Sequence, residues 1–334
     1  MSISSQSACA RPYVSFVLPC FNEAEVIKET HRRVKAVGEA LRRPYEIVAV
    51  NDGSSDNTLP LLLNLAAEDE MLVVADLSRN LGHQLALSAG LHLCAGERIL
   101  IMDADLQDPP ELLPDMLALM DQGAEVVYAQ RRSRLGDHPI KRGACAVFYR
   151  LLSHLSDHPI PLDTGDFRLI SRRVLKVILE MPERHRFLRG MISWVGFKQS
   201  PLLYDRDKRF AGETKYPLGR LVRLAMDGII ASSVRPLKLA SYAGVSLGLG
   251  SLLLIAYAIY SLLFVGRTPQ GWTSMMIVIT LTGSTQLLVL GIMGQYLGRI
   301  HEQLKGRPLF IVQNVHRKGG STRETPIAVG RITS

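Results

Sequence analysis

Two long stretches in the last third of this 334-residue chain lack every charged residue. Residues 239–266 contain no Asp, Glu, Lys or Arg, and residues 268–298, beyond Arg267, contain none either. A helix that crosses a bilayer needs about 20 consecutive, mainly apolar residues. We therefore predict two transmembrane helices, 239–265 and 272–297. Burial in a protein core explains two uncharged runs of this length much less well.

Basic residues flank this predicted hairpin on both sides. Arg235 and Lys238 precede it, and Arg299, Lys305 and Arg307 follow it. Cytoplasmic flanks of membrane helices are enriched in Lys and Arg, so both flanks are expected in the cytoplasm. This predicts a multi-pass protein of the inner (cytoplasmic) membrane with its other residues in the cytoplasm. Residues 1–11 and the polar tail after about Gly306 are expected to be flexible.

The first 130 residues alternate between apolar, β-branched runs and helix-like segments. The runs at 14–18, 46–50, 71–75, 98–102 and 125–128 are typical of buried parallel strands, and residues 24–41, 58–67, 84–94 and 110–122 are typical of helices. This alternation predicts an α/β fold, an open sheet with helices on both faces. In such sheets ligands bind beyond the carboxyl ends of the strands.

The net charge of +8 is unevenly distributed, because acidic residues predominate up to about residue 130 and basic residues predominate after it. A uniformly basic, nucleic-acid-binding surface is therefore not expected. The apolar content of 47% excludes a disordered chain. The four cysteines are widely spaced without a C-x-x-C pair, which indicates a reducing compartment and no cysteine zinc site.

After residue 131 the strand pattern fades. Residues 141–155 and 218–232 each combine an apolar face with basic residues. Two interpretations stay open for these segments: helices that pack on the surface of the domain, or helices that lie in the membrane interface.

Two carboxylates follow the fourth predicted strand. Asp103 and Asp105 are two residues apart and so point to the same side of an extended segment. One or two carboxylates together with substrate phosphates are the usual ligands of Mg²⁺, and Gln107 offers a further oxygen or a hold on a metal-bound water. We therefore predict a divalent-cation site at this strand end.

The loops after the other strands carry further polar groups. The Asp52 carboxylate can accept hydrogen bonds from a ribose or a base. The Glu23 carboxylate can bind a ribose diol. Arg79 suits a base or a phosphate, whereas Asp56 serves equally well as a helix N-cap. The first loop lacks G-x-G-x-x-G, which argues against a dinucleotide cofactor.

Taken together, these loops resemble the nucleotide-sugar-binding half of the family two glycosyltransferases, which have the GT-A fold. The matching segments are P-C-F-N-E (19–23), V-N-D-G-S-S-D (50–56), S-R-N-L-G-H (78–83) and D-A-D-L-Q-D-P-P-E (103–111). In the second half, T-G-D-F-R-L (164–169), E-R (183–184), R-G (189–190), W-V-G-F (194–197) and R-F-A-G-E-T-K-Y (209–216) resemble polyisoprenyl-phosphate glycosyltransferases. With the hairpin, the chain is similar to bactoprenol glucosyltransferases, relatives of dolichol-phosphate mannose synthase, over about residues 12–310.

The resemblance implies a domain plan. A GT-A (Rossmann-like) domain would span 12–235, with the donor half at about 12–130 and the acceptor, membrane-facing half at about 131–235. The transmembrane helices at 236–300 and the cytoplasmic tail 301–334 would follow.

The resemblance also implies a role for each matching residue. The nucleotide-binding residues would be Pro19, Glu23, Asp52, Arg79, Asp103 and Arg131, the last interchangeable with Arg132 or Arg134. The ligands of Mg²⁺ or Mn²⁺ would be Asp105, Gln107 and Asp103. The residues at the reaction centre would be Asp166, Arg168 and Lys215, and those of the acceptor-phosphate site Arg206, Arg209 and Lys215.

The implied activity is inverting, metal-dependent transfer of a sugar from a nucleoside diphosphate sugar, with UDP-glucose the first expectation, to undecaprenyl phosphate in the bilayer. Other sugars, including the dolichol-phosphate-mannose type, stay open. A processive polysaccharide synthase is disfavoured because Q-x-x-R-W is absent. A non-catalytic, membrane-tethered nucleotide-sugar-binding subunit is the alternative from another class. Glycines in both apolar runs suit close helix packing, within the hairpin or between chains, and we expect a homo-oligomer.

Overall fold

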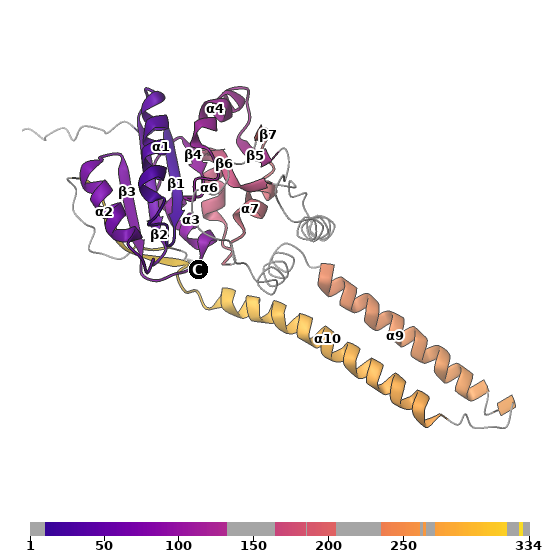
Figure 1. The fold of residues 1–334 in the computed structure, drawn as a ribbon. Coiled ribbons are helices and arrows are strands. Elements are labelled where there is room, and N and C mark those ends of the chain that lie inside the picture. The colour runs from indigo at the N-terminus through magenta and orange to yellow at the C-terminus, as the bar shows by residue number, and fades with distance from the viewer. Residues whose placement is uncertain are drawn as a thin grey trace, which may run out of the picture. The chain divides into compact units, whose positions relative to one another are not determined.

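The computed structural model describes residues 11–131, 164–184, 186–204, 235–260, 263–264, 271–318 and 327–329. The chain divides into two units. The first comprises residues 1–149, 158–217 and 306–334, and the second comprises residues 150–157 and 218–305 (Figure 1). The end of the chain therefore belongs to the same unit as its beginning. The helical segments predicted at 141–155 and 218–232 lie outside the described residues.

The strand–helix alternation predicted for the first 130 residues is confirmed. The elements are β1 (Val14–Cys20), α1 (Ile27–Ala40), β2 (Tyr45–Asn51), α2 (Thr58–Glu68), β3 (Leu72–Leu77), α3 (His83–Leu93), β4 (Arg98–Ile101), η1 (Pro110–Leu112), α4 (Leu113–Asp121) and β5 (Val126–Arg131). The predicted helix at 110–122 begins as the short 3₁₀ turn η1, with Pro110 at its first position, and continues as α4.

These strands belong to a nine-stranded mixed sheet with the order β7-β5-β6-β4-β1-β2-β3-β8-β9. Strands β4, β1, β2 and β3 are parallel, so their carboxyl ends meet at one edge. Strand β5 does not continue that parallel set. β6 (Thr164–Ser171) lies between β4 and β5, antiparallel to both, and β5 is parallel only to β7 (Gln199–Tyr204). The sheet is thus of the GT-A-like, mixed α/β kind.

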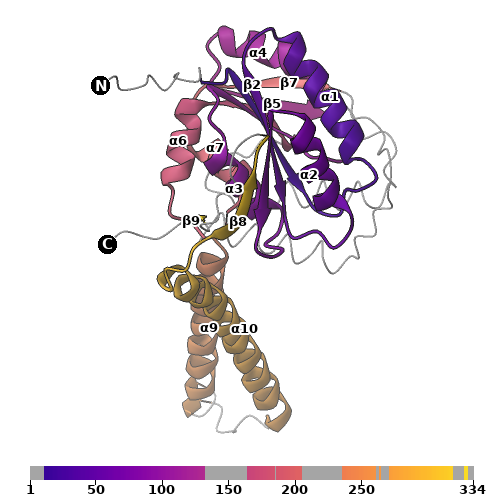
Figure 2. The same cartoon turned by 90° about the vertical axis from the view of Figure 1, so that its left-hand side faces the viewer.

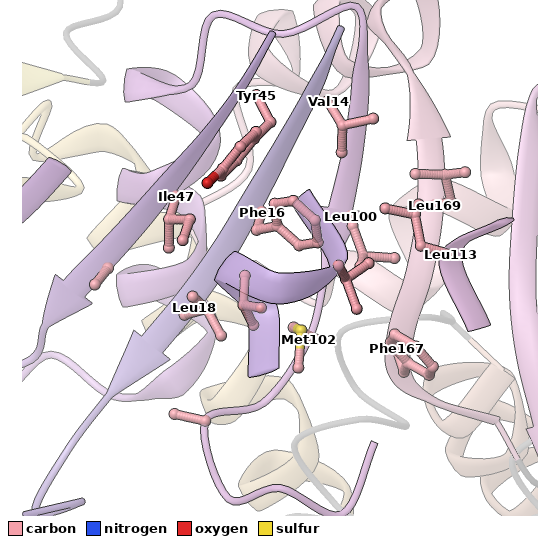
Figure 3. Close-up of a cluster of buried hydrophobic side chains, with 14 of the residues drawn as sticks. Val14, Phe16, Leu18, Tyr45, Ile47, Leu100, Met102, Leu113, Phe167 and Leu169 are labelled. Atoms are coloured by element: carbon pink, nitrogen blue, oxygen red, sulfur yellow. The ribbon is translucent and has the colours of Figure 1, made fainter. Parts of the chain in front are cut away.

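Helices cover both faces of this sheet, as predicted (Figure 2). Alternate side chains of β1 point to opposite faces, so Phe16 and Leu18 pack under α1, α2 and α4, whereas Val17 faces α3. The first of these cores also includes Leu100, Leu113 and Phe167 (Figure 3). α3, α6 (Arg172–Glu180) and α7 (Leu188–Trp194) cover the second face, on which the functional side chains of β6 project.

The polar tail contributes two strands to this sheet. β8 (Phe310–His316) pairs antiparallel with β3, and β9 (Ile327–Val329) pairs with β8. Phe310 is 2% exposed and its ring packs edge-on against His92 of α3. The prediction of a flexible tail is therefore wrong for these residues. The hydrogen bonds of β8 and the burial of its alternate side chains hold this segment, and the apolar run 309–312 was the strand signal in the sequence.

The second unit contains two long helices. α9 (Arg235–Tyr260) and α10 (Trp272–Leu304) lie side by side in Figures 1 and 2. Within the described residues, one helical segment, Ile277–Leu304, is long and apolar enough to cross a membrane, and none of its most apolar window is buried. Exposed side chains such as Leu253 of α9 and Leu287 of α10 are apolar as well.

Truncating Phe310 tests whether β8 is part of the folded domain. We expect Phe310→Ala to lower the free energy of unfolding by about 3–4 kcal/mol, because it removes a fully buried ring and leaves a cavity against α3. Ile311→Ala is the matched control, since the neighbouring Ile311 is 38% exposed and should cost less than about 1 kcal/mol. Denaturant unfolding of the detergent-solubilised protein measures both. Equal losses would contradict the placement of β8.

Candidate active site

An ion pair between β6 and α7 lies at the centre of the site. Arg189 donates from Nε to Oδ1 of Asp166 at 2.7 Å and from Nη2 to Oδ2 at 3.0 Å. Asp166 is 5% exposed, whereas the side chain of Arg189 is 28% exposed. A two-point contact of this kind fixes both the distance and the orientation of the two groups.

The first residues of α3 complete the surroundings of Asp166. His83 Nε2 lies 3.1 Å from Oδ2, and Gln84 donates from Nε2 to the same oxygen at 3.2 Å. Burial opposes ionisation of Asp166, but the charge of Arg189 and the hydrogen bonds from His83 and Arg189 outweigh it and hold the pKa of Asp166 well below its usual range. Asp166 is therefore a permanent carboxylate and a poor proton acceptor.

Asp103 faces the same nitrogen of His83, and its pKa is shifted in the opposite direction to that of Asp166. Its Oδ1 is 3.5 Å from His83 Nε2. Among the described residues this buried oxygen has no hydrogen-bond partner. Burial, together with the negative charges of Asp108, Asp166 and Asp105, raises the pKa of Asp103 to about 6, although His83 opposes the shift. A cation placed at Asp103 would relieve this unfavourable charge.

The predicted metal ligands are adjacent here and fit a divalent cation. Asp105 is 8% exposed, and its Oδ1 accepts from the Gln107 amide at 3.2 Å. Leu106 between them has a φ of 60°, a strained value that turns the chain sharply after Asp105. No group of three or more His, Cys, Asp or Glu side chains is arranged to hold a metal within the described ranges. Two carboxylates and an amide still fit Mg²⁺, because this ion is usually held by few protein ligands plus substrate phosphates.

Asp52 has a different environment from the one predicted. It is 2% exposed, and its two carboxylate oxygens accept from the backbone amides of Leu81 and Gly82 at 2.7 and 2.9 Å. Burial raises the pKa of Asp52, and these two hydrogen bonds partly offset the increase. Asp52 thus holds the loop 78–83 in place, and its oxygens are already engaged.

Other donor-side residues lie in the predicted loops. Pro19 is buried in β1, and the Glu23 amide donates to Thr58 Oγ1 at 2.8 Å. Asp56 accepts from Thr58 and from the backbone of Ala24, so it joins the first two loops as well as supporting the start of α2. Arg79 is exposed on its loop.

Two predicted arginines have positions of a different kind. Arg131 ends β5, opposite Tyr204 in the register with β7. Arg168 is 4% exposed, lies opposite Ile101 within the sheet, and donates to the Gly165 carbonyl at 3.0 Å. Burial lowers the pKa of Arg168 to about 10, and the negative charge of Asp166 opposes the decrease. Arg168 is therefore buried on the same face of β6 as Asp166, and almost none of its surface is open to an incoming substrate.

The remaining predicted residues of the acceptor side are not placed. Arg132, Arg134, Arg206, Arg209 and Lys215 lie outside the described residues, and their roles stay predictions. Conversely, sequence reasoning overlooked His83, Gln84 and Arg189 as site residues. The signal was present, because His83 ends the S-R-N-L-G-H segment and Arg189 begins the R-G segment.

A mixed α/β sheet with a carboxylate- and arginine-lined site at the carboxyl ends of its parallel strands defines a GT-A-like enzyme. Residues 15–179 match the family model described as Glycosyl transferase family 2. The chain is 46% identical to the uncharacterized glycosyltransferase YkcC of Bacillus subtilis, over 90% of this chain and 93% of that protein. The chain belongs to glycosyl transferase family 2 and is a glycosyltransferase.

Further relatives match over nearly their whole length. The uncharacterized glycosyltransferase sll0501 of Synechocystis is 39% identical over 90% of this chain and 95% of its own. A prophage-derived bactoprenol glucosyl transferase of Shigella flexneri is 37% identical over 91% of this chain and 98% of its own. Among solved structures, glucosyl-3-phosphoglycerate synthase of Mycobacterium tuberculosis, in complex with Mn²⁺, UDP-glucose and phosphoglyceric acid, aligns with a TM-score of 0.47 and 19% identity over 66% of this chain and 78% of its own.

Gly53, in the loop after β2, lies against the loop 78–83 that follows β3, and its replacement tests that contact. Its φ is +63°, and a Cβ there would lie 2.6 Å from the backbone nitrogen of Asn80. We expect Gly53→Ala to cost about 1–3 kcal/mol and to weaken nucleotide binding about tenfold by displacing the Arg79 loop.

Gly123→Ala is the matched control for Gly53→Ala. Gly123, between α4 and β5 and outside the loops of the site, also has a positive φ, of +91°, but a Cβ there would meet only Lys198 Nζ, at 3.7 Å. Its effect on nucleotide affinity, measured by isothermal titration, should be smaller. Equal affinities for Gly53→Ala and the unaltered protein would contradict the role of the contact.

Proposed function

We propose that this glycosyltransferase transfers a sugar, in the first instance glucose from UDP-glucose, to a polyisoprenyl phosphate such as undecaprenyl phosphate. The observation that carries the proposal is the 37% identity to bactoprenol glucosyl transferases, which extends over 304 residues and so includes the apolar helices as well as the catalytic domain. If the acceptor were soluble, there would be no reason for the sequence similarity to extend through the apolar helices α9 and α10.

The acceptor's chemistry explains why Asp166 need not act as a base. A phosphate monoester has a second pKa of about 6, so it is largely a dianion near neutral pH. One of its oxygens attacks the anomeric carbon from the side opposite the leaving group, and a new C–O bond forms. The bond from that carbon to the donor diphosphate breaks, and its electron pair leaves on the diphosphate oxygen. No proton transfer is required, and the configuration inverts.

The protein's task is then to position two anions and to compensate their charge. Arg189 and His83 are partly exposed, at 28% and 41%, and Asp166 fixes both. We assign them to the phosphate groups at the reaction centre. Arg168 lies buried on the same face of β6 as Asp166 and interacts electrostatically with it. We assign it this supporting role in place of the direct acceptor contact expected from the sequence. Arg206, Arg209 and Lys215 complete the acceptor side of this proposal.

Asp103, Asp105 and Gln107 are the residues that would hold Mg²⁺ or Mn²⁺ on the donor. The ion would supply positive charge to the leaving diphosphate. The buried Asp103 Oδ1, which lacks a hydrogen-bond partner among the described residues, supports this assignment.

A two-helix membrane hairpin is also part of the proposal. α9 lies beside α10, and both expose apolar side chains along their length. With basic residues on both flanks, the hairpin would keep the catalytic domain in the cytoplasm, next to the phosphate of the lipid acceptor.

Radiolabelled donor tests the reaction. Purified protein with Mn²⁺, UDP-glucose and undecaprenyl phosphate should yield a labelled lipid, and chelation by EDTA should abolish it. Asp105→Asn should lower kcat at least about 100-fold without loss of folding, because the metal loses a charged ligand. Asp115→Asn, on the exposed face of α4, is the matched control. Nucleotide binding without any labelled lipid, across donors and acceptors, would refute the transferase proposal in favour of a binding subunit.

Cysteine labelling tests the hairpin. In a cysteine-free background, Thr268→Cys should react with a membrane-impermeant maleimide in intact cells. Arg317→Cys should react only after the membrane is permeabilised, because both flanks of the hairpin are proposed to be cytoplasmic. Labelling of Arg317→Cys, or no labelling of Thr268→Cys, in intact cells would contradict this topology.

A further inference from the structure

Gln84 connects three elements around the ion pair of the site. It lies in the first turn of α3, and its carboxamide contacts Asp166 of β6 on one side and the first residue of α7 on the other. The Leu188 amide donates to Gln84 Oε1 at 3.0 Å, and Gln84 Nε2 donates to Asp166 Oδ2 at 3.2 Å. The side chain is partly buried, so water competes little for these contacts.

The orientation of this carboxamide follows from its partners. A backbone amide only donates, and the Asp166 carboxylate only accepts. Oxygen must therefore face Leu188 and nitrogen must face Asp166. The start of α7 has no side-chain cap of its own, so Gln84 also satisfies an amide that the helix leaves unpaired.

Leu188 immediately precedes Arg189, the partner of Asp166. The Gln84 carboxamide thus bonds the Asp166 carboxylate directly and also bonds the backbone next to Arg189, whose guanidinium pairs with Asp166. A shift of α7 away from β6 would break the two-point contact between Arg189 and Asp166, and a hydrogen bond at each end of Gln84 resists that shift.

We propose that Gln84 is a positioning residue for glycosyl transfer: it fixes α7 against β6 so that the Arg189 guanidinium is held on Asp166 and presented to the phosphate groups at the reaction centre. This inference rests on the proposed function for the role of Arg189 toward substrate. It does not depend on which sugar is transferred.

Two substitutions separate positioning from simple capping of α7. Gln84→Met keeps the length and loses both hydrogen bonds. Gln84→Glu keeps an acceptor for Leu188 but places a second carboxylate against Asp166. Ser88→Ala, one turn further along α3, is the matched control, because Ser88 only bonds back to the Gln84 carbonyl of its own helix.

We expect kcat to fall about 10- to 100-fold in Gln84→Met, the loss typical of a hydrogen bond to a charged group, while KM for the nucleotide sugar changes less than about threefold. Gln84→Glu should lose at least as much, and Ser88→Ala should stay within about twofold of the unaltered protein. Normal kcat in Gln84→Glu would show that Gln84 only caps α7 and would overturn the proposal. So would a loss confined to donor KM.

A second measurement distinguishes failure of this inference from failure of the proposed function. In thermal unfolding, the Tm decreases of Gln84→Met and Arg189→Met should be clearly less than additive in the double variant, since both act on one contact. If the unaltered protein forms no labelled lipid, the proposed function fails. The Tm comparison of the single and double variants still tests whether Gln84 positions Arg189. Additive decreases would overturn the positioning role even in an active enzyme.

Discussion

Crowding of negative charge at one edge of the sheet is the constraint on which the site depends. Asp52, Asp103 and Asp105 follow strands that meet there, and Asp166 lies near the start of β6, beside the end of β4. Burial, together with the charges of Asp108, Asp166 and Asp105, raises the pKa of Asp103. Like charges this close are not all ionised without compensation. The structure provides that compensation separately for each carboxylate. Asp52 receives two backbone amides, and Asp166 receives Arg189, His83 and Gln84. Asp103 is left with its charge unfavourable.

The carboxylates of the site therefore differ in what they bind. Asp52 and Asp166 hold protein elements, namely the loop 78–83 and the start of α7. Asp103, whose buried Oδ1 has no hydrogen-bond partner among the described residues, is where an added cation gains most. Arg189 supplies positive charge beside Asp166 from the protein itself. In the proposed reaction a metal held by Asp103 and Asp105 would add positive charge for the donor diphosphate.

The sequence was sufficient for the parts of this arrangement that depend on local pattern. Apolar runs predicted β1 to β5, and polar residues at their ends placed Asp52, Asp103 and Asp105 at the same edge. The sequence was insufficient where contacts between segments far apart in the chain determine the structure. Strand β6 comes after β5 in the chain yet inserts between β4 and β5, and both Asp166 and Arg168 of this strand are buried. Asp166 and Arg189 come from a strand and a helix whose approach no spacing rule predicts, so the partner that fixes the ionisation of Asp166 was overlooked.

The return of the chain to the sheet after α10 has a consequence for folding. β3 has a free edge until β8 pairs with it, and β8 is encoded after both long apolar helices. An exposed edge strand invites pairing with other chains, so the domain is vulnerable until residues 310–316 have been synthesised. Closing the long loop between β7 and β8 also carries an entropic cost, which grows only slowly with loop length.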